Sequence, residues 1–74
     1  MFDLTRLRLL LELSRRGTMI AVADACAMTS SAVSQQLATL EREAGVVLLE
    51  RVGRRVRMTA EGERLAAHAA TILA

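Results

Sequence analysis

The feature of this sequence that most constrains its fold is an apolar stripe with helical spacing between residues 30 and 44. Its members recur at intervals of four, three and four residues: Val33, Leu37, Leu40 and Ala44. Residues spaced in this way lie on one face of an α-helix. Thr29, just before this segment, is a favoured N-cap residue, and Gly45, just after it, is favoured at a helix end. The pattern predicts a helix from about Ser30 to Ala44 with one buried face.

The opposite face of this predicted helix is unusual for a surface helix. It carries short or hydrogen-bonding side chains together with one arginine: Ser30, Ser31, Ser34, Gln35, Ala38 and Arg42. The face lacks the Glu and Lys pairs that are typical of a solvated helix. The major groove of DNA admits one α-helix, whose side chains can reach the base edges. A single serine at a helix start is often only a cap, but the whole set predicts a helix that faces DNA.

A shorter predicted helix precedes it, at the spacing of a helix-turn-helix motif. Thr18 is a candidate cap for a helix that continues through Ala27. Its inward candidates are Val22, Ala23 and Cys26. The small side chain of Ala23 permits a close crossing of the two helices, and Val33, ten residues later, supplies the matching contact. Met28 is expected to pack into the turn between them.

The sequence before this motif predicts one more helix, over residues 3–16. Asp3 and Thr5 are start signals, and Gly17 is a stop signal. The inward candidates follow helical spacing: Leu4, Leu7, Leu10, Leu11 and, more loosely, Ser14.

After Gly45 the pattern changes from helical to β-prone. Two runs, 46–49 and 56–58, flank a turn at Gly53 and predict a two-stranded hairpin. The segment 51–57 holds four arginines and no acid: Arg51, Arg54, Arg55 and Arg57. Such a charge run by itself is equally typical of a solvated turn. Beside the helical motif, the local positive charge predicts contacts with a polyanion.

The final predicted helix begins at Thr59 and is rich in alanine. Glu61 and Glu63 lie in its first turns, where negative charge complements the helix dipole. One face is lined by Leu65, Ala69 and Ile72, with Ala66 and Leu73 beside it. Two interpretations of this face stay open, namely docking onto its own domain and self-association.

Composition limits the class of protein further. A chain of 74 residues that is 53% hydrophobic, with a single aromatic residue, predicts one aliphatic domain. A small monomer does not easily bury so many hydrophobic side chains. We therefore expect part of the apolar surface to meet a second chain or a missing domain. The single cysteine, Cys26, allows no internal disulfide and no cysteine pair for zinc. We expect a cytoplasmic protein without a metal, a cofactor or a membrane span.

Catalysis is not expected. The candidate pairs are Cys26, or a serine, with the lone His68. Cys26 is predicted on an inward helix face, where a thiol behaves as a small apolar residue. His68 lies in the alanine-rich helix without an evident orienting acid. Neither arrangement predicts an activated nucleophile.

Residues 17–37, followed by Leu40-Glu41, Gly45-Val46 and Leu49-Glu50-Arg51, resemble LysR-type transcriptional regulators. The resemblance covers essentially the whole chain, and residues 53–62 resemble the family's wing and the start of its dimerising linker helix. It implies a mainly α fold with a small β-hairpin, in which a winged helix-turn-helix is followed by a C-terminal linker helix. By position, it implies that one set of residues touches DNA: Thr29, Ser30, Ser31, Ser34 and Gln35. It implies that a second set lies on phosphate or in the minor groove: Arg51, Arg54 and Arg55.

The sequence departs from the family's pattern on the proposed DNA face and in the core. Ser31 stands where proline is frequent, and Gln35 stands where arginine is frequent, so the preferred operator is expected to differ. Met19 and Leu49 replace the usual aromatic residues and leave an aliphatic core.

We therefore predict a sequence-specific, double-stranded DNA-binding domain over residues 1–58 and a linker or dimerisation helix over residues 59–74. An effector-binding domain and a small-molecule site are expected to be absent from this chain. A homodimer formed through Leu65, Ala69 and Ile72 would read two half-sites about 34 Å apart, or multiples of that distance. The protein would be nucleoid-associated when bound to DNA. The alternative is a winged protein-interaction module without DNA binding, which does not account for the arginine cluster.

Overall fold

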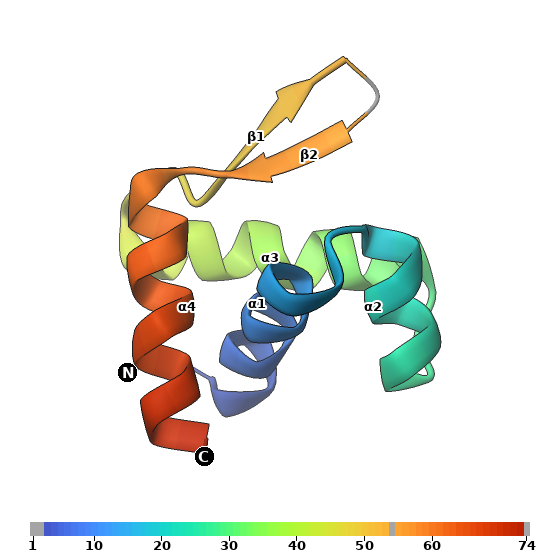
Figure 1. The fold of residues 1–74 in the computed structure, drawn as a ribbon, viewed down its shortest axis with the longest axis horizontal. Helices are drawn as coiled ribbons and strands as arrows, with labels where there is room; N and C mark the ends of the chain where they lie inside the picture. Colours follow the sequence, from blue (N-terminus) through green and yellow to red (C-terminus); the bar gives the residue numbers. More distant parts are fainter. Residues whose placement is uncertain (1–2, 54, 74) are drawn as a thin grey trace.

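A computed structural model describes residues 3–53 and 55–73, which form helices and one two-stranded hairpin (Figure 1). The helices are α1 (Leu4–Arg16), α2 (Met19–Cys26), α3 (Ser30–Ala44) and α4 (Ala60–Leu73). The strands are β1 (Leu49–Val52) and β2 (Arg55–Met58). They pair antiparallel, with Leu49 opposite Met58 and Val52 opposite Arg55. Hereafter the two strands and the turn between them are called the wing.

Helix α1 occupies the centre of the molecule, with α2, α3 and α4 packed around it (Figure 1). Because three helices cover it, its buried residues extend beyond one stripe: Leu7, Leu9, Leu10, Leu11 and Leu13. The prediction for this helix was wrong at its two ends. Leu4, in the first turn, is 58% exposed, and Ser14, in the last turn, is exposed as well. The core is concentrated on the middle turns, where all three neighbours meet α1.

Local capping signals set the helix boundaries as predicted. The Thr18 and Thr29 hydroxyls accept the backbone N–H groups of Ala21 and Ala32, each at 3.1 Å. Asp3 accepts the Thr5 N–H at 2.7 Å, and this hydrogen bond holds the pKa of Asp3 below its usual value. Gly17 and Gly45 end α1 and α3 in the left-handed conformation, which glycine adopts without strain.

The first strand begins three residues later than predicted, at Leu49 rather than at residue 46. The apolar run that suggested a strand instead contains an anchor for the core, because Leu48 is only 1% exposed. Val46 and Val47 lie in the connection after α3 and remain exposed. Hydrophobicity in this segment therefore marks a side chain inserted between helices, not a ladder of paired strands.

Helix α4 packs mainly against α1 and belongs to the same core as the rest of the domain. Its buried residues are Gly62, Ala66 and Ala69. The small side chains of Ala66 and Ala69 let α4 approach α1 closely, whereas Gly62 lies against the backbone of Leu48. Neither described stretch, 3–53 or 55–73, includes a helix with the length and apolarity needed to span a membrane.

Candidate nucleic-acid interface

The two faces of α3 are separated as the sequence predicts. Val33, Leu37 and Leu40 are buried against the other helices. The residues proposed to touch DNA from this segment are all exposed: Thr29, Ser30, Ser31, Ser34 and Gln35. A polar face of this kind on the second helix of a helix-turn-helix is positioned to enter a major groove. Whether each of these side chains contacts DNA stays a prediction.

The turn between α2 and α3 fixes the angle at which α3 is presented. Ala27 ends α2 in the left-handed conformation, with φ 54° and ψ 45°, and the Met28 N–H donates to the Ala23 carbonyl at 2.9 Å. Val22 and Ala23 are buried, and Met28 packs against the core as predicted. A non-glycine residue in the left-handed region is strained. This conformation of Ala27 was not predicted from the sequence.

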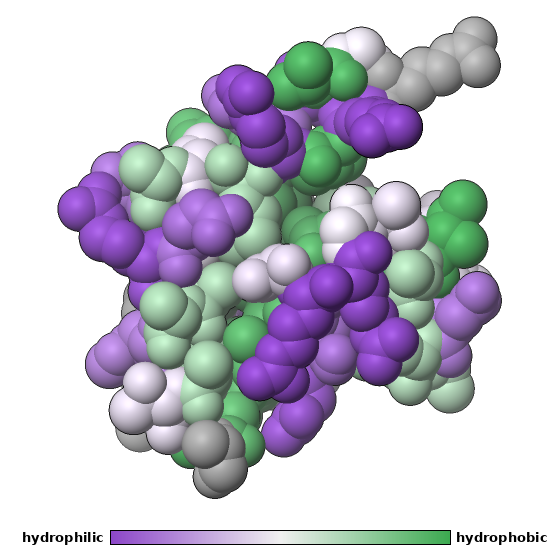
Figure 2. Space-filling model, in the orientation of Figure 1, coloured by the Kyte–Doolittle hydropathy of each residue, from purple (hydrophilic) through white to green (hydrophobic). Residues whose placement is uncertain are grey.

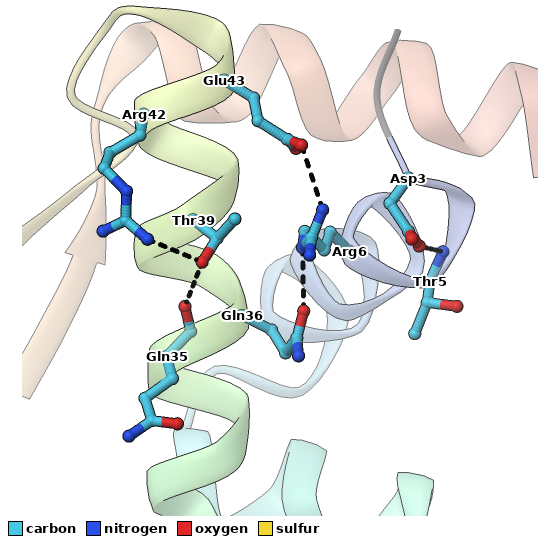
Figure 3. A network of polar contacts seen from close by, with 8 residues as sticks. All are labelled: Asp3, Thr5, Arg6, Gln35, Gln36, Thr39, Arg42 and Glu43. Carbon is cyan, nitrogen blue, oxygen red and sulfur yellow. Dashed lines mark hydrogen bonds and ion pairs between the residues drawn. The ribbon is translucent and has the colours of Figure 1, made fainter.

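The two neighbouring glutamines of α3 have different surroundings (Figure 3). Arg6 of α1 donates from Nε to Gln36 Oε1 at 2.8 Å and from Nη1 to Glu43 Oε2 at 3.0 Å. Gln36 therefore ties α3 to α1. The Gln35 side chain points away from this network, and within the described residues its amide has no hydrogen-bond partner (Figure 3). Its amide is available for a bidentate contact with a base.

Arg42, on the same outer face of α3, is held by a local network. Arg42 Nη2 donates to Thr39 Oγ1 at 2.9 Å, and Thr39 Oγ1 donates to the Gln35 carbonyl oxygen at 3.1 Å (Figure 3). This chain of bonds runs along the helix surface and keeps the guanidinium close to α3.

The arginines of the wing have different surroundings. Arg51 is exposed and lines a groove of about 170 Å³ together with Ser34 and Ala38 of α3. Arg57 donates from Nε and Nη2 to Glu50 Oε1, at 3.1 and 2.8 Å, and Glu50 also lines this groove. Arg55 is exposed, whereas Arg54 lies outside the described residues. Figure 2 shows hydrophilic side chains flanking hydrophobic ones along the wing, at the top of the view. The structure thus brings one predicted arginine, Arg51, to the same groove as the polar face of α3.

The predicted dimerisation residues do not share one accessible face. Ala69 is 0% exposed because α4 packs against α1, so this residue is not available to a second chain. Leu65 is partly buried and packs against the core, while Ile72 is 48% exposed. Ala69 is buried because α4 docks onto its own domain. Its predicted place in the dimer interface is therefore corrected.

The residues considered above for catalysis, Cys26 and His68, lie on different helices. Among residues 3–53 and 55–73, no cluster of three or more His, Cys, Asp or Glu side chains is arranged to hold a metal ion. Cys26 is partly buried on α2, and His68 is exposed on α4. The exposed face of α3 and the wing remain the candidate interface.

Comparisons with known proteins agree with this geometry. Residues 4–63 match the family model described as a bacterial regulatory helix-turn-helix protein of the lysR family. The chain is 41% identical over 70 residues to the transcriptional regulator DmlR of Escherichia coli, covering 95% of this chain and 23% of that protein. It is 37% identical over 73 residues to a probable RuBisCO transcriptional regulator of Cyanophora paradoxa, covering 99% of this chain and 22% of that protein. The chain thus spans less than a quarter of these relatives.

Solved structures of DNA-bound domains share the fold. The BenM DNA-binding domain in complex with a benA site superposes with a TM-score of 0.89 at 30% sequence identity, covering 97% of this chain and 81% of that one. The CbnR DNA-binding domain in complex with DNA gives a TM-score of 0.90, also at 30% identity, covering 97% and 83%. The predicted winged helix-turn-helix is confirmed by this likeness and by the observed elements. The chain belongs to the lysR family of bacterial regulatory helix-turn-helix proteins.

Proposed function

We propose that this domain binds double-stranded DNA sequence-specifically and serves in the regulation of transcription. The observation that carries the proposal is the groove in which Arg51 of the wing faces Ser34 and Ala38 of α3. A helix that reads bases and a cation that binds the neighbouring backbone must lie this close, since one duplex has to meet both. The DNA-bound structures of BenM and CbnR domains, which share this fold, support the proposal.

The side chains divide between reading and anchoring. Gln35, with an amide that is not used inside the domain, is suited to a bidentate contact with adenine. Ser30, Ser31 and Ser34 give adaptable, weakly selective contacts, and Thr29 lies where a phosphate contact fits best. Arg51 and Arg55 contribute charge, which strengthens binding to every sequence alike.

Dimerisation supplies the second half-site. We propose a homodimer through α4 in which Ile72, exposed near the end of that helix, packs against the second copy together with the exposed part of Leu65. Two copies of α3 would then meet half-sites about 34 Å apart on one face of the duplex. We also propose a cytoplasmic location, in keeping with a regulator that works on DNA.

The test is selection of bound duplexes from a random DNA pool, followed by fluorescence-anisotropy titration of variants. Arg55→Ala should weaken binding to all duplexes. The slope of log K against the logarithm of the salt concentration, hereafter the salt slope, should become smaller in magnitude by about 0.9. Gln35→Ala should change the preferred base at one position and leave the salt slope unchanged. Arg64→Ala is the matched control, since this exposed arginine lies on α4 and pairs with Glu61.

A failed selection would point elsewhere. If the pool yields no enriched duplex and binding is equally weak to all sequences, the domain is not a sequence-specific reader. Association with proteins but not with DNA would favour the interaction-module alternative.

A further inference from the structure

The base of the wing is tied to α3 by a single carboxylate. Glu41, in the last turns of α3, accepts through Oε2 the backbone N–H of Leu48 at 2.8 Å and that of Leu49 at 3.1 Å. Both N–H groups lie where the chain enters β1, and both bonds are partly buried. Hydrogen bonds to an ionised acceptor are stronger than neutral ones. One side chain therefore fixes the start of β1 relative to α3.

The other end of the wing is held by different contacts. Thr59, which follows β2, donates from its backbone N–H to the Leu48 carbonyl at 2.9 Å and from Oγ1 to the Val47 carbonyl at 2.6 Å. These bonds join the two ends of the wing to each other and to α4. Among the described residues, Glu41 makes the polar link from the base of the wing to α3.

The position of Glu41 is electrostatically unfavourable for DNA binding. Glu41 lines the same groove as Ser34 and Arg51, where DNA phosphates are proposed to lie. A carboxylate in such a place repels phosphate, so charge alone would favour a neutral residue. Its two bonds to backbone N–H groups give a reason for its presence despite this cost.

We propose that Glu41 is a positioning residue for DNA binding. It holds the wing at the angle that keeps Arg51 opposite Ser34, so that the anchoring and the reading contacts engage one duplex together. The inference rests on the proposed function, since it concerns how the same interface is assembled. Loss of the acceptor oxygen should release the wing from α3 and leave the base contacts of α3 in place.

Three variants of Glu41 separate the effect of side-chain length from the effect of its negative charge. Glu41→Ala removes the acceptor, Glu41→Asp keeps the charge but shortens the side chain, and Glu41→Gln keeps an acceptor oxygen at full reach without the charge. Binding is measured by fluorescence anisotropy over a salt series, with a duplex selected by the wild-type protein. Amide hydrogen exchange of Leu48 and Leu49 reports directly on the two bonds.

We expect Glu41→Ala and Glu41→Asp to bind about tenfold more weakly. Their salt slopes should be smaller by about 0.9 for each wing arginine that loses its phosphate. Exchange protection of the Leu48 and Leu49 amides should fall in both variants. Glu41→Gln should keep most of the wild-type affinity, salt slope and amide exchange protection. The base preference should be unchanged in all three variants. If Glu41→Ala does not fold, the proposal is tested by comparing Glu41→Asp with Glu41→Gln.

Three outcomes would overturn the proposal. Tighter binding by both Glu41→Ala and Glu41→Gln would show that Glu41 only repels DNA. A lower active fraction in a stoichiometric titration, with the salt slope unchanged, would show a role in stability alone. Wild-type behaviour of Glu41→Asp would show that reach is irrelevant. Ala67→Gly, an exposed change that weakens α4 through helix propensity, is the control and should keep the wild-type slope. Absence of selective binding by the wild-type protein would instead refute the proposed function.

Discussion

Replacing Gly62 with alanine should destabilise the domain, although helix propensity predicts the opposite. Gly62 lies in the first turn of α4, where alanine would ordinarily be favoured over glycine by about 1 kcal/mol. An added Cβ would, however, press against the Leu48 carbonyl oxygen, with the Leu48 carbonyl carbon at 3.2 Å and its Cα at 3.4 Å. These are backbone atoms of a buried residue, so they cannot turn aside as a side chain would.

The magnitude follows from the contacts that must give way. Overpacking of a close contact costs about 1–3 kcal/mol. The Leu48 carbonyl also accepts the Thr59 N–H at 2.9 Å, and weakening that bond costs about 1 kcal/mol more. This second cost roughly offsets the gain in helix propensity. We therefore expect a net loss of about 2 kcal/mol in the free energy of unfolding, or about 10 °C in Tm for a domain of this size.

Urea unfolding followed by far-UV circular dichroism measures this loss. Ala67→Gly, on the exposed side of the same helix, is the matched control and should lose about 1 kcal/mol through propensity alone. An unfolding midpoint for Gly62→Ala at or above that of the wild type, with the control behaving normally, would refute the argument that α4 rests directly on the Leu48 backbone.

Three further predictions concern the turn, the dimer and the first cap. Ala27→Gly should raise the free energy of unfolding by about 1 kcal/mol in urea titrations, because glycine relieves the left-handed strain at φ 54° and this gain exceeds its extra unfolded-state entropy. Ile72→Glu should convert a dimer to a monomer in sedimentation experiments while leaving the circular dichroism spectrum intact, since Ile72 is exposed; an unchanged sedimentation coefficient would place the interface elsewhere. The pKa of Asp3 is lowered in the folded state by the Thr5 N–H, so its stabilising contribution is present above about pH 3.8 and is lost as the pH falls through the lowered value. The urea midpoint of Asp3→Asn, which does not titrate, should therefore fall less than that of the wild type between pH 7 and pH 2, and equal falls would contradict this.

Helix boundaries were predictable from sequence because they depend on neighbouring residues. Thr18, Thr29 and Gly45 cap their helices through bonds that span a few positions, and such signals are visible without knowledge of the fold. The buried stripe of α3 was predictable for the same reason, as its spacing reflects one helix and one core.

Features that depend on the third dimension were not predictable. The run 46–49 resembles a strand, yet Leu48 is drawn into the core between α3 and α4, which delays the start of β1. Ala69 has the residue type of an interface between chains, and only the packing of α4 on α1 shows that it is already covered.

The polar residues of the candidate site illustrate the same limit. Gln35 and Gln36 are equivalent in composition, and the difference between them arises from Arg6, thirty positions away from Gln36. Glu41 is evident in sequence only as an acid after Leu40, and its role depends on two amides that the chain brings back to it.

The contact between Gly62 and Leu48 also has a mechanical consequence. From this point α4 runs away from the wing, and its far end lies on the opposite side of the molecule (Figure 1). The twelve residues from Gly62 to Leu73 extend about 16 Å at the rise of an α-helix. Helix α4 is thus held at two places, on the backbone before β1 through Gly62 and on α1 through Ala66 and Ala69. A displacement of α4 along its contact with α1 would be transmitted, through Leu48, to the hairpin that we propose lies beside DNA.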